Sequence, residues 1–245
     1  MADLPLAQPQ DLTADLTRDN LAPEPVFSGL VTPIPRRAGR PKDTAKRAAI
    51  LQAAHVLFAN QPYDLVTMEA VADLAGVSKM TIYSHLQDKE TLFETVVASV
   101  SDQMIAAITA PAPGGARERL TGVGIAFLQV VLGSDVCRMA HTLPGTLRAK
   151  PGLASRFYAA GPGRVRAALA EIIAREAHDG MLTVDDPMLA ADDLVCLWEG
   201  GMPERIAYGL SGLCGPAEIA RRAIRGTAVF LRAYAASPGL APTGS

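Results

Sequence analysis

The sequence holds few cysteines and almost no excess of either charge. Three cysteines among 245 residues are too few, and odd in number, for a disulfide framework, which favours a reducing compartment. Lys and Arg total 23 against 25 Asp and Glu, so the chain is not basic throughout, although a local basic patch fits that balance. No apolar run approaches the ~20 residues of a membrane helix, and residues 1–9 lack the basic and apolar segments of a signal peptide. These absences argue against a secreted, fibrous or membrane protein and favour a cytoplasmic one.

Strand-like alternation is also scarce. No convincing run of alternating polar and apolar residues exceeds about four residues, and no internal repeat is present, whereas apolar residues recur at helical spacing. The hydrophobic fraction of 49% is enough for a sizeable core. In the second half of the chain, glycine and proline separate segments expected to be helical, at about 116–133, 135–142, 152–160, 163–178, 187–208 and 216–236. The sequence therefore predicts an all-α fold.

Charge and proline content change abruptly near residue 36. Residues 1–35 carry five acidic residues against one arginine, and six prolines that oppose helix interiors and sheet ladders. Residues 1–38 are therefore expected to be a disordered acidic tail that ends in a basic arm; a docking arm built on the apolar residues around Phe27 is the alternative. Residues 36–47 reverse the sign, with six basic residues against one acidic residue. Gly39 and Pro41 are expected to keep the front of this run out of a helix, which begins at Asp43.

Residues 67–86 have the spacing of a helix-turn-helix. Thr67 is expected to cap one short helix, Gly76 to close it in a left-handed conformation, and Ser78 to cap the next. Ile82 and Leu86 fall on the inner face of this second helix. Its free face carries Lys79, Met80, Thr81, Tyr83, Ser84 and His85. Such a helix fits the major groove of B-DNA, where short polar side chains reach base edges.

The stretch from Gly39 to about Val97 resembles the DNA-binding domain of the TetR family of bacterial transcriptional repressors. The shared positions are Ile50, Ala53-Ala54, Leu57-Phe58, Thr67, Val71-Ala72, Ala75-Gly76-Val77-Ser78, Thr81-Ile82-Tyr83, His85-Leu86, Lys89-Glu90 and Leu92. Two departures are Leu86, where Phe is commoner, and Asn60-Gln61-Pro62 in place of a glycine-bearing turn. Residues 151–190 resemble the AefR-like C-terminal domain through the runs that begin at Phe157 and Asp185. The resemblance implies a three-helix DNA-binding head at residues 39–104 and a six-helix ligand-binding and dimerisation domain at 112–238.

The resemblance also implies which residues contact DNA. A basic arm of Arg36, Arg37, Arg40 and Lys42 would follow phosphates or enter the minor groove. Thr67, Tyr83, His85 and Lys89 would meet phosphates. Lys79, Met80, Thr81 and Ser84 would read bases, with Ser78 at the start of the reading helix. Core packing of Tyr83 and His85, and capping duties for Thr67 and Lys89, are the structural alternatives.

The partners implied by the resemblance are a second copy of the chain, a palindromic double-stranded DNA operator and a small apolar effector. Candidate residues for the effector site are Phe127, Met139, His141, Phe157, Trp198, Glu199 and Met202. Gly200, Gly201 and Pro203 interrupt the expected helix 187–208, either to admit a neighbouring helix or to open a cavity. Surplus apolar residues on helices 163–178 and 187–208 are expected at the dimer interface. They are Val165, Leu169, Ile172, Ile173, Leu189, Leu194, Val195, Leu197, Trp198 and Ile206.

No catalytic or metal centre is expected. Cys137 and His141 have the spacing of metal ligands on a helix, but no second pair accompanies them, and no cofactor motif is present. The four histidines offer no nucleophile and base arrangement. We therefore expect a ligand-responsive repressor rather than an enzyme. The alternatives are an all-α enzyme or hydrophobic-ligand carrier that keeps a helix-turn-helix, or a TetR-like activator. The sequence does not name the effector, the operator, the regulated genes or the role of the tail.

Overall fold

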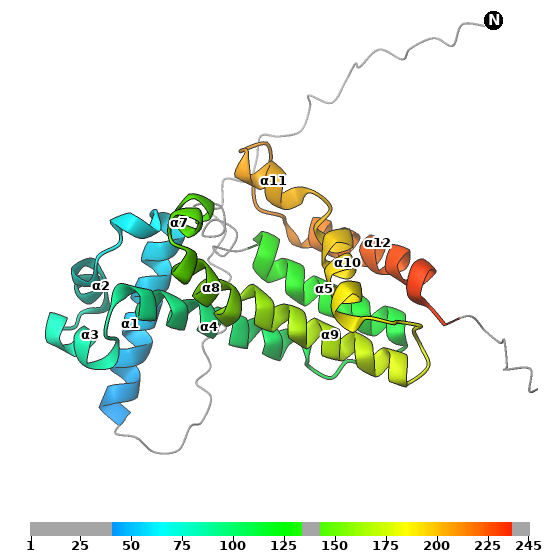
Figure 1. Ribbon diagram of the computed structural model, residues 1–245, viewed down its shortest axis with the longest axis horizontal. Helices are drawn as coiled ribbons and strands as arrows, with labels where there is room; N and C mark the ends of the chain where they lie inside the picture. The colour runs from blue at the N-terminus through cyan, green and yellow to red at the C-terminus, as the bar shows by residue number, and fades with distance from the viewer. Residues whose placement is uncertain (1–40, 134–142, 237–245) are drawn as a thin grey trace, which may run out of the picture. The chain divides into compact units, whose positions relative to one another are not determined.

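The computed structural model describes residues 41–133 and 143–236. Within these ranges the chain is helical, with loops between the helices and a single isolated bridge between Leu182 and Ala235 (Figure 1). The prediction of an all-α fold is confirmed. The basic-arm residues Arg36, Arg37 and Arg40 lie outside the described residues, as do the expected helix 135–142 and its Met139 and His141.

The first half of the described chain contains α1 (Pro41–Asn60), the short 3-10 helix η2 (Tyr63–Leu65), α2 (Met68–Ala75), α3 (Lys79–His85) and α4 (Lys89–Ile108). The expectation that α1 starts at Asp43 is wrong, because the helix begins at Pro41. Proline fits this position since its fixed φ matches the first turn of a helix, where its missing N–H costs no hydrogen bond.

The second half contains α5 (Ala116–Gly133), α7 (Pro144–Ala149), α8 (Pro151–Ala160), α9 (Pro162–His178), α10 (Pro187–Glu199), α11 (Met202–Ala207) and α12 (Pro216–Tyr234). Helix α7 was not expected. The expected interruption of the 187–208 helix is observed, and the segment is divided into α10 and α11 because Gly200 and Gly201 both adopt left-handed conformations, with φ of 50° and 76°.

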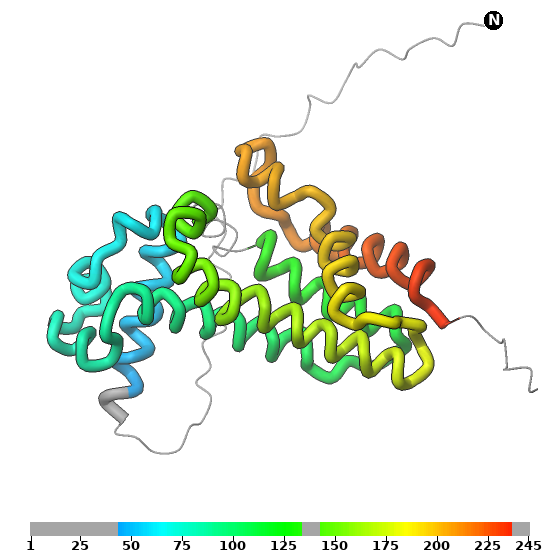
Figure 2. Tube along the Cα trace, viewed as in Figure 1, coloured from blue at the N-terminus to red at the C-terminus, as the bar shows by residue number. Residues whose placement is uncertain are grey.

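The apolar side chains form two clusters. One joins α1 to the first half of α4 through residues such as Phe58, Ile82 and Phe93. The other joins the end of α4 to α5, α9, α10 and α12, and Trp198 and Phe230 are fully buried in it. In this second cluster α12 packs on α5 and α10, and α10 packs on α9 (Figure 2). Helix α4 therefore contributes side chains to both clusters.

Helix α4 is also the one described helix with the length and mean hydropathy of a membrane span, which the sequence analysis did not expect. Its mean hydropathy is 1.2 over the most apolar window, and 39% of that window is buried. Core helices of globular proteins meet the same criteria. The side chains of Leu92, Phe93 and Val96 are buried in the cluster that contains α1 and α2. The apolar character of α4 is thus used in packing within the described chain.

Candidate nucleic-acid interface

Local hydrogen bonds shape the helix-turn-helix. The Thr67 hydroxyl accepts a hydrogen bond from the backbone N–H of Ala70 at 3.1 Å and caps α2. Gly76 ends α2 with φ of 65°, and the backbone N–H of Val77 returns to the Ala72 carbonyl at 3.0 Å. The Ser78 hydroxyl then accepts from the Thr81 N–H at 3.2 Å and caps α3. These three devices turn the chain sharply between α2 and α3.

The two faces of α3 differ completely in exposure. Ile82 is 0% exposed and anchors one face in the cluster with α1 and α2. Met80 is 80% exposed and Tyr83 is 42% exposed on the rest of the helix, and Ser84 is also exposed. Tyr83 is therefore not a core aromatic, and a surface of one apolar and several polar side chains is open to a partner.

The hydroxyl groups near α3 already have partners within the helix. The Ser78 and Thr81 hydroxyls lie 2.9 Å apart, and Ser84 donates to the Thr81 carbonyl at 2.8 Å. His85 is half-buried in the last turn. The hydroxyls of Thr81 and Ser84 keep lone pairs that can accept a further hydrogen bond.

Lys79, at the start of α3, forms an ion pair with Glu69 of α2. The Glu69 hydrogen bond raises the pKa of Lys79, and the ammonium also lies 5.8 Å from the centre of the Tyr83 ring. Both partners are largely exposed, so water and salt weaken the pair. Sequence spacing alone gave no sign of Glu69 as a partner for Lys79.

Lys89, at the start of α4, lies against the 3-10 helix η2, which precedes α2. Its ammonium donates to the Asp64 carbonyl at 3.2 Å and stands 4.4 Å from the centre of the Tyr63 ring. This partial burial lowers the pKa of Lys89, whereas burial raises the pKa of Tyr63 to about 12. The Asp88 carboxylate caps α4 by accepting from the Thr91 N–H at 2.7 Å. Lys89 therefore ties the start of α4 to η2, the 3-10 helix that precedes α2.

The residues expected to bind an effector do not gather in one place. Phe127 and Trp198 lie with their ring centres 5.8 Å apart, and Met202 is buried in the same cluster. Phe157 instead stacks on Phe93 at 5.9 Å, in the cluster that contains α1 and α2. The structure thus brings together Phe127, Trp198 and Met202 and places Phe157 elsewhere.

Glu199 is the one acidic member of the expected effector set. It is the last residue of α10, it is partly buried, and desolvation raises its pKa. The nearby charges of Arg166 and Glu204 act in opposite directions on that pKa. The Arg222 guanidinium donates a hydrogen bond to the backbone carbonyl oxygen of Glu199, with a nitrogen–oxygen distance of 2.7 Å. The partly buried Glu199 thus follows the buried Trp198 in the chain.

The apolar residues expected at a dimer interface differ in solvent exposure. The expectation is wrong for the members that are buried in their own chain, which are Val165, Leu169, Ile172 and Ile173 on α9 and Leu194, Val195 and Trp198 on α10. The burial of the α9 residues follows from the packing of α9 against α8 and α10. Leu189 and Leu197 of α10 are exposed, as are Ile224 and Val229 of α12, which were not among the expected residues.

Comparisons with known proteins agree with this geometry. A family profile described as "Bacterial regulatory proteins, tetR family" matches residues 50–96, and one for the C-terminal domain of AefR-like transcriptional repressors matches residues 118–236. The HTH-type transcriptional activator FasR of Mycolicibacterium smegmatis is 32% identical over 73 residues, which cover 30% of this chain and 33% of FasR. The HTH-type transcriptional repressor KstR2 of the same organism is 28% identical over 115 residues, which cover 41% of this chain and 54% of KstR2.

A solved structure extends the likeness over most of the chain. The crystal structure of a protein from Mesorhizobium loti assigned to the TetR-family regulators is 27% identical, with a TM-score of 0.69, and the match covers 81% of this chain and 100% of that one. The matches to curated relatives, in contrast, span only 33% to 54% of their lengths. The two profiles and the shared fold lead to one conclusion: the chain belongs to the TetR family of bacterial regulatory proteins.

Proposed function

We propose that this chain is a DNA-binding transcriptional regulator, and specifically a ligand-responsive repressor that binds a palindromic operator as a dimer. One observation carries the proposal. Helix α3 buries Ile82 completely, while Met80 and Tyr83 project from a helix that Ser78 caps after a tight left-handed turn. A short helix anchored on one side and free on the other is what the major groove accepts.

The helix N-termini supply the phosphate contacts in this proposal. Thr67 and Lys89 mark the starts of α2 and α4, where unpaired backbone amides and the helix dipole favour an anion. Tyr83 and His85 add donors from α3, and the arm of Arg36, Arg37, Arg40 and Lys42 adds positive charge. Lys79, Met80, Thr81 and Ser84 read the bases, and Lys79 leaves Glu69 to do so.

The dimer forms through α10 and α12 in this proposal, from the domain at 112–238. These two helices pack on each other, and both expose apolar residues, of which Leu189 is 59% exposed. A two-fold axis would place the same patch of each chain against its copy. Two heads at residues 39–104 would then meet half-sites roughly 34–36 Å apart, or a multiple of that.

The effector is a small, largely apolar molecule in this proposal, bound beside Phe127, Trp198 and Met202. These three residues lie in the buried cluster next to Glu199, whose carboxyl group is the nearby polar feature that would orient a ligand. No catalytic step or cofactor is part of the proposal.

The test is a selection of bound DNA from a random library, followed by affinity measurements. The selected sequences should be palindromic, and binding should weaken steeply as salt is raised, because phosphate contacts release counterions. Tyr83→Ala should weaken binding to every sequence, whereas Tyr208→Ala, which removes another exposed tyrosine just after α11, should leave binding unchanged. If the purified protein enriches no sequence, the proposal fails and an all-α enzyme or ligand carrier is the better hypothesis. A footprint relative to the promoter separates a repressor from an activator.

A further inference from the structure

Helix α8 packs with the DNA-binding helices although it lies far along the chain. Leu153 and Ala160 are buried in the cluster formed by α1, α2, α3 and the first half of α4. Phe157 of α8 stacks on Phe93 of α4, with ring centres 5.9 Å apart and planes 17° apart. This apolar contact seats α8 on α4, and polar contacts between the two helices accompany it.

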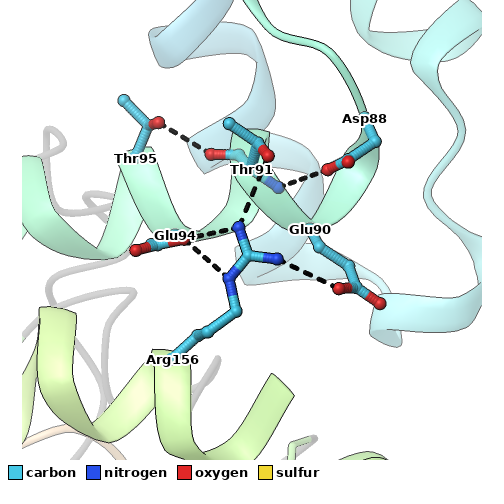
Figure 3. A network of polar contacts seen from close by, with 6 residues as sticks. All are labelled: Asp88, Glu90, Thr91, Glu94, Thr95 and Arg156. Atoms are coloured by element: carbon cyan, nitrogen blue, oxygen red, sulfur yellow. Dashed lines mark hydrogen bonds and ion pairs between the residues drawn. The ribbon is translucent and has the colours of Figure 1, made fainter. Parts of the chain in front are cut away.

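Arg156 of α8 reaches the first two turns of α4 (Figure 3). Its Nε donates to Glu94 at 2.8 Å, one terminal nitrogen donates to Glu90 at 3.1 Å, and the other lies 2.6 Å from Glu94 and 3.4 Å from the Thr91 hydroxyl. The hydrogen bond to Glu94 raises the pKa of Arg156. The guanidinium thus spans two carboxylates one helical turn apart, a geometry that a planar fork holds better than a point charge.

A second set of contacts joins the α7–α8 junction to the 3-10 helix η2, which precedes α2. Lys150 lies 2.6 Å from the Asp64 carboxylate, and the Thr146 hydroxyl donates to the same group at 3.3 Å. Lys150 also stands 5.0 Å from the centre of the Tyr63 ring, on which Lys89 rests as well. Asp64 precedes the α2 cap Thr67 by three residues. The contacts of Arg156 therefore end at the N-terminus of α4, and those of Lys150 end at η2, which leads into the N-terminus of α2; both N-termini face phosphates in the proposed function.

We propose that Arg156 and Lys150 are positioning residues for DNA binding, which together form a clamp that fixes the N-terminus of α4 relative to η2, the segment that leads into the N-terminus of α2. This inference rests on the proposed DNA-binding function. The clamp acts on phosphate contacts only, because none of its bonds reaches α3, whose side chains read the bases. Loss of the clamp therefore weakens binding to all sequences by the same factor and leaves the preference for the operator unchanged.

The chain offers a matched control for Arg156. Arg164 of α9 pairs with Asp102 of α4 at 2.5 Å, so it is also an ion pair onto α4, and the arginines are similarly exposed, at 41% for Arg164 and 37% for Arg156. Arg164 contacts α4 at Ala98 and Asp102, both beyond Glu94, and touches neither helix N-terminus. Removal of Arg164 costs one surface ion pair onto α4, whereas removal of Arg156 costs two, and only Arg156 belongs to the clamp.

The experiment measures the affinity of the full chain for its selected operator and for an unrelated duplex of equal length. Arg156→Ala should weaken both by roughly fivefold, the upper end for a surface ion pair, so that their ratio is unchanged. Arg156→Lys should retain most of the affinity, and Arg156→Glu should lose the most, because it places a third carboxylate beside Glu90 and Glu94. Arg164→Ala should bind both duplexes like the wild type.

Amide hydrogen exchange of the DNA-free protein separates positioning from general unfolding. Arg156→Ala should speed exchange in residues 63–70 and 88–95, with the rest of the protein protected as before. The clamp would be overturned if the two alanine variants bound DNA equally well, or if Arg156→Ala changed the operator preference rather than overall affinity. If the wild type bound no DNA at all, the proposed function would fall, and the clamp's role in DNA binding with it.

Discussion

Gly124 of α5 provides a direct test of how tightly the interior around Trp198 is packed. A Cβ atom at Gly124 would lie 2.6 Å from Cε2 of the indole and 2.8 Å from Nε1, well inside the ~3.5 Å of an ordinary carbon contact. The ring has no room to retreat, since it is 0% exposed and a Cβ at Gly226 of α12 would meet it at 2.6 Å on Cδ1. The indole N–H is also held, because it donates to the Thr227 hydroxyl at 3.1 Å.

The expected cost of Gly124→Ala follows from three effects. Overpacking of a filled core costs about 1–3 kcal/mol, and a strained or broken hydrogen bond to Thr227 adds about 1 kcal/mol. Replacing glycine by alanine inside a helix returns about 1 kcal/mol. We therefore expect Gly124→Ala to lower the free energy of unfolding by about 1–3 kcal/mol. Gly122→Ala on the same helix is the control: the site is exposed and has open space, so this change should raise stability by about 0.5–1 kcal/mol.

Urea unfolding followed by tryptophan fluorescence measures both variants, and Trp198 is the only tryptophan in the chain. The two substitutions should shift the unfolding midpoint in opposite directions. Equal or parallel shifts would refute the packing argument and show that the indole has free volume beside it.

Three further predictions concern a helix cap, a buried acid and the dimer. Asp88→Ala should lower the free energy of unfolding by about 1 kcal/mol through loss of the α4 cap. The hydrogen bond from the Thr91 N–H lowers the pKa of Asp88, so Asp88 stabilises the fold above the ordinary Asp pKa. In acid unfolding scans this contribution should disappear as pH falls through the lowered pKa. Burial raises the pKa of Glu199, so the wild type loses stability as pH rises through this raised pKa. Glu199→Gln should therefore raise the melting temperature at neutral pH but not near pH 4. Leu189→Asp should yield a monomer mass by light scattering, whereas Leu74→Asp, which alters an equally exposed leucine of α2, should remain a dimer.

The helix-turn-helix was predictable because its determinants are local. Thr67 and Ser78 each accept a backbone N–H three residues ahead, and Gly76 takes a left-handed conformation that most other residues avoid. Such features depend on neighbours a few positions away, which the sequence displays directly. The same holds for the starts of α8, α9, α10 and α12, each of which has proline in its first turn.

Packing partners were not predictable in the same way. Helical periodicity shows that Val165 and Ile173 share a face, but not that this face is covered by the same chain rather than by a second copy. Phe157 fits an effector site by residue type, yet α8 carries it to Phe93 because Leu153 and Ala160 are buried beside the DNA-binding helices. The interruption of the helix at Gly200 and Gly201 was expected, but the sequence did not show that both residues adopt left-handed conformations.

The two apolar clusters are connected by more than α4. Helix α8 lies in the cluster that contains α1 and α2, and it continues through Gly161 into α9, which lies in the other cluster. The junction is crowded, since a Cβ at Gly161 would stand 2.7 Å from a methyl group of Val97 on α4. A movement of α9 would therefore press on α4 near Val97 and pull on Arg156, which holds the start of α4. Any change in the C-terminal helices that shifts α9 thus acts on α4 at two points: through packing at Val97 and through the ion pairs of Arg156 at its start.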